Sequence, residues 1–179
     1  MAIIIKSPET PEEFRSMWQL NGDVFCRELG LRDLPAEGIL VDRFHGDNFY
    51  HIAWDGAQVV GMLCAHSNPP YSAVEHFGEV MEREIIPDHT AEIRLFALRP
   101  GVRGSRIAAK LALALGNDLR ARQIVKVLIS AVADQCRLYR HLGFMNIGEP
   151  IDERGVQLYP MIADVENSYQ LLCRIYREQ

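Results

Sequence analysis

The order of elements between residues 92 and 144 constrains the fold more than any other feature of the sequence. Residues 92–98 form an apolar run that stops at Arg99-Pro100-Gly101, a strong breaker. From Ser105 onward, apolar residues recur at three- and four-residue spacing, which predicts an amphipathic helix. Residues 125–133 are rich in β-branched side chains and predict a buried strand. Two apolar strands joined by a helical crossover pair in parallel, with a right-handed connection.

The turn at the start of this helix gathers positive charge. Arg99, Arg103 and Arg106 surround Gly104 and Ser105 where the strand ends and the helix begins. The first backbone N–H groups of a helix have no partner inside it, and the helix dipole favours negative charge there. The turn is therefore either an anion site, suited to phosphate groups, or a solvated basic turn. It matches neither the Walker A loop nor the dinucleotide fingerprint.

The rest of the chain predicts helices and strands in alternation. Thr10-Pro11-Glu12-Glu13 and Ser72-Ala73-Val74-Glu75 are capping boxes that predict helix starts, and Asp55-Gly56 between apolar runs predicts a hairpin. The predicted order is strand, helix, strand, strand, helix, strand, helix, strand, helix, strand, strand, helix. We expect one α/β domain over residues 1–179, with a mixed sheet of about seven strands flanked by helices on both faces.

Composition excludes several classes of protein. The chain is 48% hydrophobic and 24% charged, which argues against disorder, and its net charge of -5 argues against general nucleic-acid binding. Its four cysteines include no C-x-x-C pair, so we expect reduced thiols in a cytoplasmic protein. No apolar run has the length of a membrane span. The sequence contains no G-x-S-x-G, no H-E-x-x-H and no His/Cys cluster with ligand spacing, so neither a serine hydrolase nor a metal site is predicted.

The segment Leu138-Tyr139-Arg140-His141-Leu142-Gly143-Phe144 follows the second strand. Together with the basic turn it resembles the core of the GNAT superfamily of N-acyltransferases. The pyrophosphate loop of that family follows the pattern Q/R-x-x-G-x-G/A, in which Arg103 fits the first position and Ala108 the last. Arg106 stands where the family has its central glycine, and a side chain there either crowds the pyrophosphate or adds a charge to it.

The resemblance implies a GNAT-like fold and a thioester donor, acetyl-CoA or another acyl-CoA. It implies that the turn holds the pyrophosphate and that the backbone N–H groups at the end of the central strand hold the thioester carbonyl and the pantetheine arm. The turn residues are Arg103, Gly104, Ser105, Arg106, Ile107 and Ala108, and the strand residues are Phe96, Ala97 and Leu98.

Acyl transfer to an amine requires a neutral amine, a donor for the oxyanion and a proton for the leaving thiolate. Glu92, at the start of the central strand, is the candidate base, directly or through water. It is otherwise an exposed edge carboxylate or a partner of Arg94. Tyr139 is the candidate acid, a role implied by the matched L-Y-x-x-x-G-F. It is otherwise a packing tyrosine whose hydroxyl is satisfied elsewhere.

A second resemblance lies in the first half of the chain. Phe25 in the first predicted helix, Asp42 in the following loop and the strand residues Val59-Val60-Gly61 are similar to a GNAT branch. This branch comprises the acyl-homoserine-lactone synthases and the long-chain N-acyl amino acid synthases. It implies a longer acyl chain, carried on coenzyme A or on an acyl carrier protein.

Three functional hypotheses follow. The first is an N-acyltransferase that moves an acetyl or other acyl group from acyl-CoA to a primary amine of a small molecule or peptide. The second is a synthase of the long-chain type, with acyl-CoA or acyl carrier protein as partner. The third is a GNAT-fold module that binds acyl-CoA without turnover. The acceptor pocket is expected at the first helix, the 31–48 loop and the 151–165 turn, and exposed strand edges leave a homodimer open.

Overall fold

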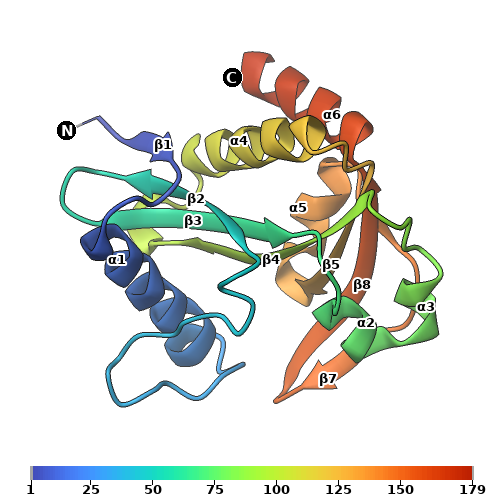
Figure 1. Ribbon diagram of the computed structural model, residues 1–179, viewed down its shortest axis with the longest axis horizontal. Coiled ribbons are helices and arrows are strands. Elements are labelled where there is room, and N and C mark those ends of the chain that lie inside the picture. Colours follow the sequence, from blue (N-terminus) through green and yellow to red (C-terminus); the bar gives the residue numbers. More distant parts are fainter. Residues whose placement is uncertain (1, 179) are drawn as a thin grey trace. The chain divides into compact units, whose positions relative to one another are not determined.

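The computed structural model describes residues 2–178 (Figure 1). The chain divides into two compact units. The N-terminal unit contains the chain up to Ala65 together with Leu95–Leu115, and the C-terminal unit contains His66–Arg94 and the chain from Gly116 onward. The strands follow the order β1-β2-β3-β4-β5-β8-β6 in an eight-stranded mixed sheet, with β7 paired to β8. The expectation of a single domain over 1–179 stays a prediction.

The N-terminal unit begins with three antiparallel strands. Strand β1 (Ile4–Lys6) pairs with β2 (Phe49–Trp54), which pairs with β3 (Val59–His66). The turn between β2 and β3 is the predicted hairpin. Asp55 accepts hydrogen bonds on Oδ1 from the N–H groups of Ala57 (2.9 Å) and Gln58 (2.8 Å), which lowers the pKa of its carboxyl group.

Helix α1 (Pro11–Gly22) starts with the predicted capping box, in which Thr10 and Glu13 each accept a hydrogen bond from the other's backbone N–H. The helix continues into a π-helical turn, η1 (Asp23–Glu28). The inner face of α1 and η1 packs against the strands in a shared hydrophobic core. Burial of each large apolar side chain stabilises the fold by roughly 1.5–3 kcal/mol. The fully or nearly buried members of that core are Met17, Leu20, Val24, Tyr50, Ile52, Val59, Met62, Cys64, Leu95 and Ala97.

The 31–48 segment has no regular secondary structure but is attached to α1 by hydrogen bonds. The N–H of Leu40 donates to the carbonyl of Trp18 (3.0 Å), and Asn21 Nδ2 donates to the carbonyl of Leu40 (2.7 Å). Asn21 Oδ1 has no hydrogen-bond partner within residues 2–178. Asn21 is thus a buried amide that is hydrogen-bonded through its nitrogen only.

Gly61 lies in β3 where α4 (Ile107–Ala121) and β4 (Thr90–Leu98) come close to the strand. A Cβ atom at Gly61 would lie 2.6 Å from Leu98 Cδ2, 3.0 Å from Leu111 Cδ1 and 3.4 Å from Ile107 Cγ2. A bulge lies next to this glycine as well, because the β2–β3 register shifts between Ala53 and Trp54.

We expect Gly61→Ala to lower the free energy of unfolding by about 1–3 kcal/mol, because an extra methyl group overpacks this contact. Urea unfolding followed by circular dichroism measures the change. Gly46→Ala is the matched control, because a Cβ atom there meets no atom within 4 Å, and we expect it to be neutral or slightly stabilising. Equal midpoints for the two variants would contradict the close approach.

The C-terminal unit contains two short helices, α2 (Ser72–Phe77) and α3 (Glu79–Glu82), followed by the first residues of β4. Strand β5 (Lys126–Val132) pairs in parallel with β4, from Thr90–Lys126 to Glu92–Leu128, which confirms the predicted parallel pair. The 3₁₀ turn η3 (Ala133–Gln135) leads into α5 (Cys136–His141). Gly143 follows the end of α5 with φ at 85°, a left-handed conformation that glycine commonly takes just after a helix.

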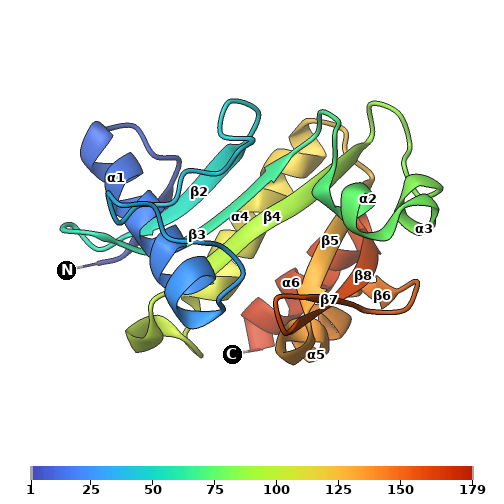
Figure 2. The same cartoon turned by 90° about the horizontal axis from the view of Figure 1, so that it is seen from below.

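Strand β8 (Val156–Asp164) is the common partner of the other strands at the end of this unit (Figure 2). It runs antiparallel to β5, and both β6 (Met145–Asn146) and β7 (Ile151–Glu153) run antiparallel to β8. The sequence alone favours a single strand over residues 145–151, and the structure shows that this prediction is wrong. Pro150 has no N–H to donate to a ladder, so the segment divides into two short strands around it. Helix α6 (Val165–Glu178) follows β8.

Within residues 2–178, the structure contains no helix with the length and apolar character of a membrane span.

Candidate active site

The basic turn lies in the N-terminal unit between β4 and α4. Its chain passes through a 3₁₀ turn, η2 (Pro100–Val102), and Gly104 has φ at 74°, a left-handed conformation that glycine adopts without strain. Helix α4 begins at Ile107 instead of Ser105, because the Ser105 hydroxyl forms hydrogen bonds within the turn that precedes the helix. Ser105 Oγ donates to the carbonyl of Val102 (2.6 Å) and accepts from the N–H of Ile107 (3.3 Å).

Arg103, the predicted pyrophosphate ligand, is held in two directions. Its Nε donates to the carbonyl of Leu98 (3.1 Å), and its Nη1 and Nη2 donate to the two carboxylate oxygens of Glu28 at 2.7 and 2.6 Å. This hydrogen-bonded ion pair lowers the pKa of the Glu28 carboxyl group and raises the pKa of Arg103. A bidentate pair of this kind fixes the plane of the guanidinium. A phosphate bound by Arg103 would therefore share it with Glu28 or displace Glu28.

Arg99 binds its own unit instead of facing solvent. Its N–H donates to the carbonyl of Val60 (2.9 Å), its Nε donates to the carbonyl of Val59 (3.0 Å), and its Nη1 lies 3.6 Å from Asp23 Oδ2. Arg106 is exposed at the start of α4. Of the three arginines in the turn, Arg103 and Arg106 are therefore the exposed ones.

The predicted binding residues at the end of β4 are Phe96, Ala97 and Leu98. Ala97 is 2% exposed and belongs to the core, while Phe96 and Leu98 are partly exposed. Their role toward a thioester stays a prediction, as do the roles of Ile107, which is buried, and Ala108 at the start of α4.

Glu92 is 2% exposed and makes contacts with both carboxylate oxygens, all within the C-terminal unit. Oε1 accepts from the N–H of Ala73 (2.9 Å), and Oε2 accepts from the N–H of Ser72 (2.8 Å). Because these are the first N–H groups of α2, Glu92 supplies the negative charge that a helix N-terminus favours. The predicted capping box of Ser72 and Glu75 is wrong, since no side chain of that segment caps the helix.

His66 is fully buried, and both of its ring nitrogens contact oxygen atoms, one of which belongs to Glu92. Its Nδ1 is 2.8 Å from the carbonyl oxygen of Asn68, an acceptor only, so Nδ1 carries a proton. Its Nε2 is 3.1 Å from Glu92 Oε2, and a hydrogen bond there requires a second proton. The pair is thus either an imidazolium with a carboxylate or a neutral imidazole with a carboxylic acid.

Arg94 completes this cluster. Its Nη1 lies 3.5 Å from Glu92 Oε2 and also donates to the hydroxyl of Ser72. The carboxylate therefore pairs with Arg94, one of the alternatives that the sequence left open, but it is buried and is not an exposed edge group. To remove a proton directly from an amine, Glu92 would have to exchange one of these contacts for the substrate.

Tyr139 lies in α5, where its ring packs edge-on against Phe144 with centroids 5.3 Å apart. Burial raises the pKa of Tyr139 to about 12, and the nearby thiol of Cys136 adds a smaller effect in the same direction. The hydroxyl therefore stays protonated through the neutral range. It suits a hydrogen-bond donor toward a thiolate better than a group that gives up its proton completely.

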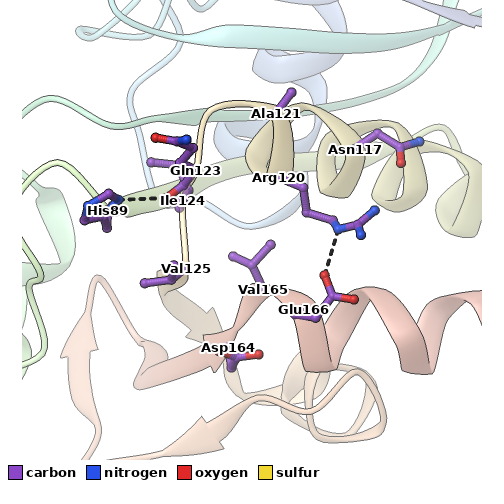
Figure 3. Close-up of a pocket in the computed structure, with 10 residues that line it drawn as sticks. All are labelled: His89, Asn117, Arg120, Ala121, Gln123, Ile124, Val125, Asp164, Val165 and Glu166. Carbon is purple, nitrogen blue, oxygen red and sulfur yellow. Dashed lines mark hydrogen bonds and ion pairs between the residues drawn. The ribbon is translucent and has the colours of Figure 1, made fainter.

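The C-terminal unit also has an open hollow of about 800 Å³ at the C-terminus of α4 and the start of α6 (Figure 3). Ion pairs and hydrogen bonds occupy its polar lining. Arg120 Nε lies 2.8 Å from Glu166 Oε2, and His89 Nδ1 donates to the carbonyl of Gln123 (2.9 Å). The sequence-predicted site residues are absent from its lining, so we do not assign the reaction to it.

Sequence reasoning missed Glu28 and His66 as partners of the predicted site residues. Glu28 is 75 positions from Arg103, and His66 is 26 positions from Glu92. Neither residue carries a local motif that would identify it. Within the residues that the structure describes, no group of three or more His, Cys, Asp or Glu side chains has the geometry of a metal site.

The fold combines a parallel strand pair, a basic turn that leads from the first of these strands into a helix, and a short helix that carries the partly exposed Tyr139. The chain belongs to the acetyltransferase (GNAT) family, whose model matches residues 13–144. Family membership supports acyl transfer as the general activity. No curated protein matches the chain.

Solved structures support the same fold. A CoA-dependent acyl-homoserine lactone synthase, BjaI, with SAM and isopentyl-CoA aligns with a TM-score of 0.82 at 16% identity, over 97% of this chain and 89% of that one. The AHL synthase LasI aligns with a TM-score of 0.78 at 17% identity, over 96% and 94%. A Lactobacillus plantarum protein described as an N-acetyltransferase aligns with a TM-score of 0.68 at 17% identity, over 92% and 99%.

Proposed function

We propose that this protein is an N-acyltransferase that moves an acyl group from acyl-CoA to a primary amine. The observation that carries the proposal is the turn between β4 and α4 in a GNAT-family chain. There, Gly104 turns the backbone and Arg103 and Arg106 place two exposed guanidinium groups at the start of a helix. Arginine charge beside a helix N-terminus favours phosphate.

For the chemical step we propose Tyr139 as the hydrogen-bond donor to the leaving sulfur. A hydroxyl that is protonated at neutral pH stabilises a thiolate as it forms. For Glu92 we propose proton removal from the amine through water, because its own oxygens already accept hydrogen bonds from the backbone of α2. His66 then provides the neighbouring site from which protons are exchanged.

A second candidate is a long-chain synthase, with the acyl group on coenzyme A or on an acyl carrier protein. The likeness to acyl-homoserine lactone synthase structures favours it, because two of these align over nearly the whole chain. The acceptor in this case is an amine on a small molecule. A clear preference for long-chain acyl-CoA over acetyl-CoA in binding and turnover would favour this candidate.

The test is calorimetric titration of the protein with CoA, acetyl-CoA and a long-chain acyl-CoA. We expect binding of CoA that weakens at least tenfold in Arg103→Ala, because the variant loses its phosphate contact. In Glu28→Gln we expect tighter binding than in the wild type, because the carboxylate that holds the guanidinium is neutralised. Absence of binding to all three ligands would contradict the proposed CoA site at this turn.

Turnover distinguishes an enzyme from a module that only binds acyl-CoA. Release of free thiol from acyl-CoA is measured with and without a panel of amines. Amine-dependent release supports the enzyme, whereas tight binding without release supports the binding module.

A further inference from the structure

A serine, a histidine and a glutamate from three different elements of the C-terminal unit are connected by two successive side-chain contacts, with the histidine in the middle. Ser130 lies in β5, His76 in α2 and Glu153 in β7 (Figure 2). His76 Nδ1 is 3.1 Å from Ser130 Oγ, and His76 Nε2 is 3.4 Å from Glu153 Oε2. The side chains of His76 and Glu153 are 22% and 23% exposed, and Ser130 is also partly exposed, so reagents from solvent reach the group.

The hydrogen-bond roles of these three side chains follow from the carboxylate. Glu153 only accepts when ionised, so it favours the tautomer of His76 with its proton on Nε2. The lone pair of Nδ1 then faces Ser130 and accepts the hydroxyl proton. A base that contacts a hydroxyl on one side and is oriented by a carboxylate on the other is the arrangement that activates serine as a nucleophile. The two ring nitrogens have exchanged their usual places, which leaves the proton transfer unchanged.

The backbone of Ser130 provides a donor for the negative charge that such an attack creates. Successive N–H groups of a strand point alternately to its two neighbouring strands. The N–H of Val165 donates to the carbonyl of Val125 (2.9 Å), and the β5–β8 register has no bulge, so the odd-numbered residues of β5 form their backbone hydrogen bonds with β8. Ser130 is even-numbered, and its N–H therefore points toward β4. The described β4–β5 ladder ends at Glu92–Leu128, two residues before Ser130. The nucleophile's own N–H is one of the oxyanion donors used by serine hydrolases.

We propose that Ser130, His76 and Glu153 form a second catalytic group that hydrolyses activated esters and thioesters through an acyl-serine intermediate. Ser130 Oγ forms a bond to the acyl carbon as the carbon–sulfur bond breaks. Its proton passes to His76 Nδ1 and then to the leaving thiolate. Water next attacks the ester, gives a proton to His76, and the carbon–Oγ bond breaks as that proton returns to Ser130. The products are a carboxylic acid and a thiol.

The test is covalent labelling of the full chain with a fluorophosphonate, which reacts with activated serines and requires no coenzyme A. We expect one adduct by intact mass, mapped to Ser130 by peptide sequencing. The adduct is absent in Ser130→Ala, and labelling slows at least tenfold in Glu153→Gln, which keeps the shape of the side chain but removes its charge. Ser7→Ala, an exposed serine of the N-terminal unit, labels like the wild type.

Hydrolysis of 4-nitrophenyl acetate provides the second readout. We expect a burst of nitrophenol equal to the enzyme concentration, which is lost in Ser130→Ala. Circular dichroism of each variant shows whether it is folded. No adduct on the folded wild type, or an adduct that persists in Ser130→Ala, overturns the proposal. Because labelling needs neither CoA nor an amine, its failure and the failure of the CoA titration are separate results.

Discussion

Glu92→Ala should lower the stability of the C-terminal unit by about 3–5 kcal/mol, the loss typical when one member of a buried charged network is removed. The substitution would remove the carboxylate that His66, Arg94 and the first N–H groups of α2 share. Glu92→Gln keeps the shape but places a donor where the carboxylate accepted, and about 1–3 kcal/mol should be lost. Urea unfolding followed by circular dichroism measures both variants.

Glu79→Gln is the control for Glu92. Glu79 pairs with Arg83 at 2.6 Å, but both side chains are more than 70% exposed, and exposed pairs of this spacing contribute only about 0.3–0.5 kcal/mol. If Glu92→Ala unfolds at the same urea concentration as Glu79→Gln, then Glu92 does not hold α2. If Glu92→Gln unfolds at nearly the same urea concentration as the wild type but no longer transfers the acyl group, the catalytic role of Glu92 is favoured.

Tyr139→Phe should reduce the rate of acyl transfer by roughly a hundred- to a thousand-fold, the range for loss of one hydrogen-bond donor to charge that develops in the transition state. Donor affinity should change little, because the hydroxyl interacts with the sulfur only as charge develops. The ring contact with Phe144 stays, so the variant should fold. The rate effect is measured as kcat in an activity assay, and the effect on donor affinity is measured by calorimetric titration with CoA.

Tyr169→Phe is the matched control for Tyr139. Its ring packs against Arg120, with the guanidinium carbon 4.4 Å from the ring centroid, and removal of the hydroxyl leaves that contact in place. We expect wild-type rates in this variant. Equal rates in Tyr139→Phe and the wild type would assign Tyr139 to packing alone. Because burial raises the pKa of Tyr139 to about 12, its ionisation should leave the rate profile below about pH 10 unchanged.

Local patterns in the sequence determined much of the fold. The capping box at Thr10 and the Asp55-Gly56 hairpin were both predicted, because each depends on residues within a few positions of one another. The parallel pairing of β4 and β5 was also predicted, because a helical crossover between apolar strands allows few other topologies. The family resemblance of the basic turn and the Leu138–Phe144 segment was confirmed by the family match.

Long-range contacts were decided by the tertiary structure alone. The start of α2 was predicted from Ser72 and Glu75, yet the acceptor for its N–H groups is Glu92, twenty positions away from Ser72. The resemblance implied that Arg103 holds the pyrophosphate, and only folding brings Glu28 to it. Ser130, His76 and Glu153 belong to no motif. Local spacing encodes helices and turns, but a hydrogen bond between distant side chains depends on how the strands and helices pack, which no short pattern records.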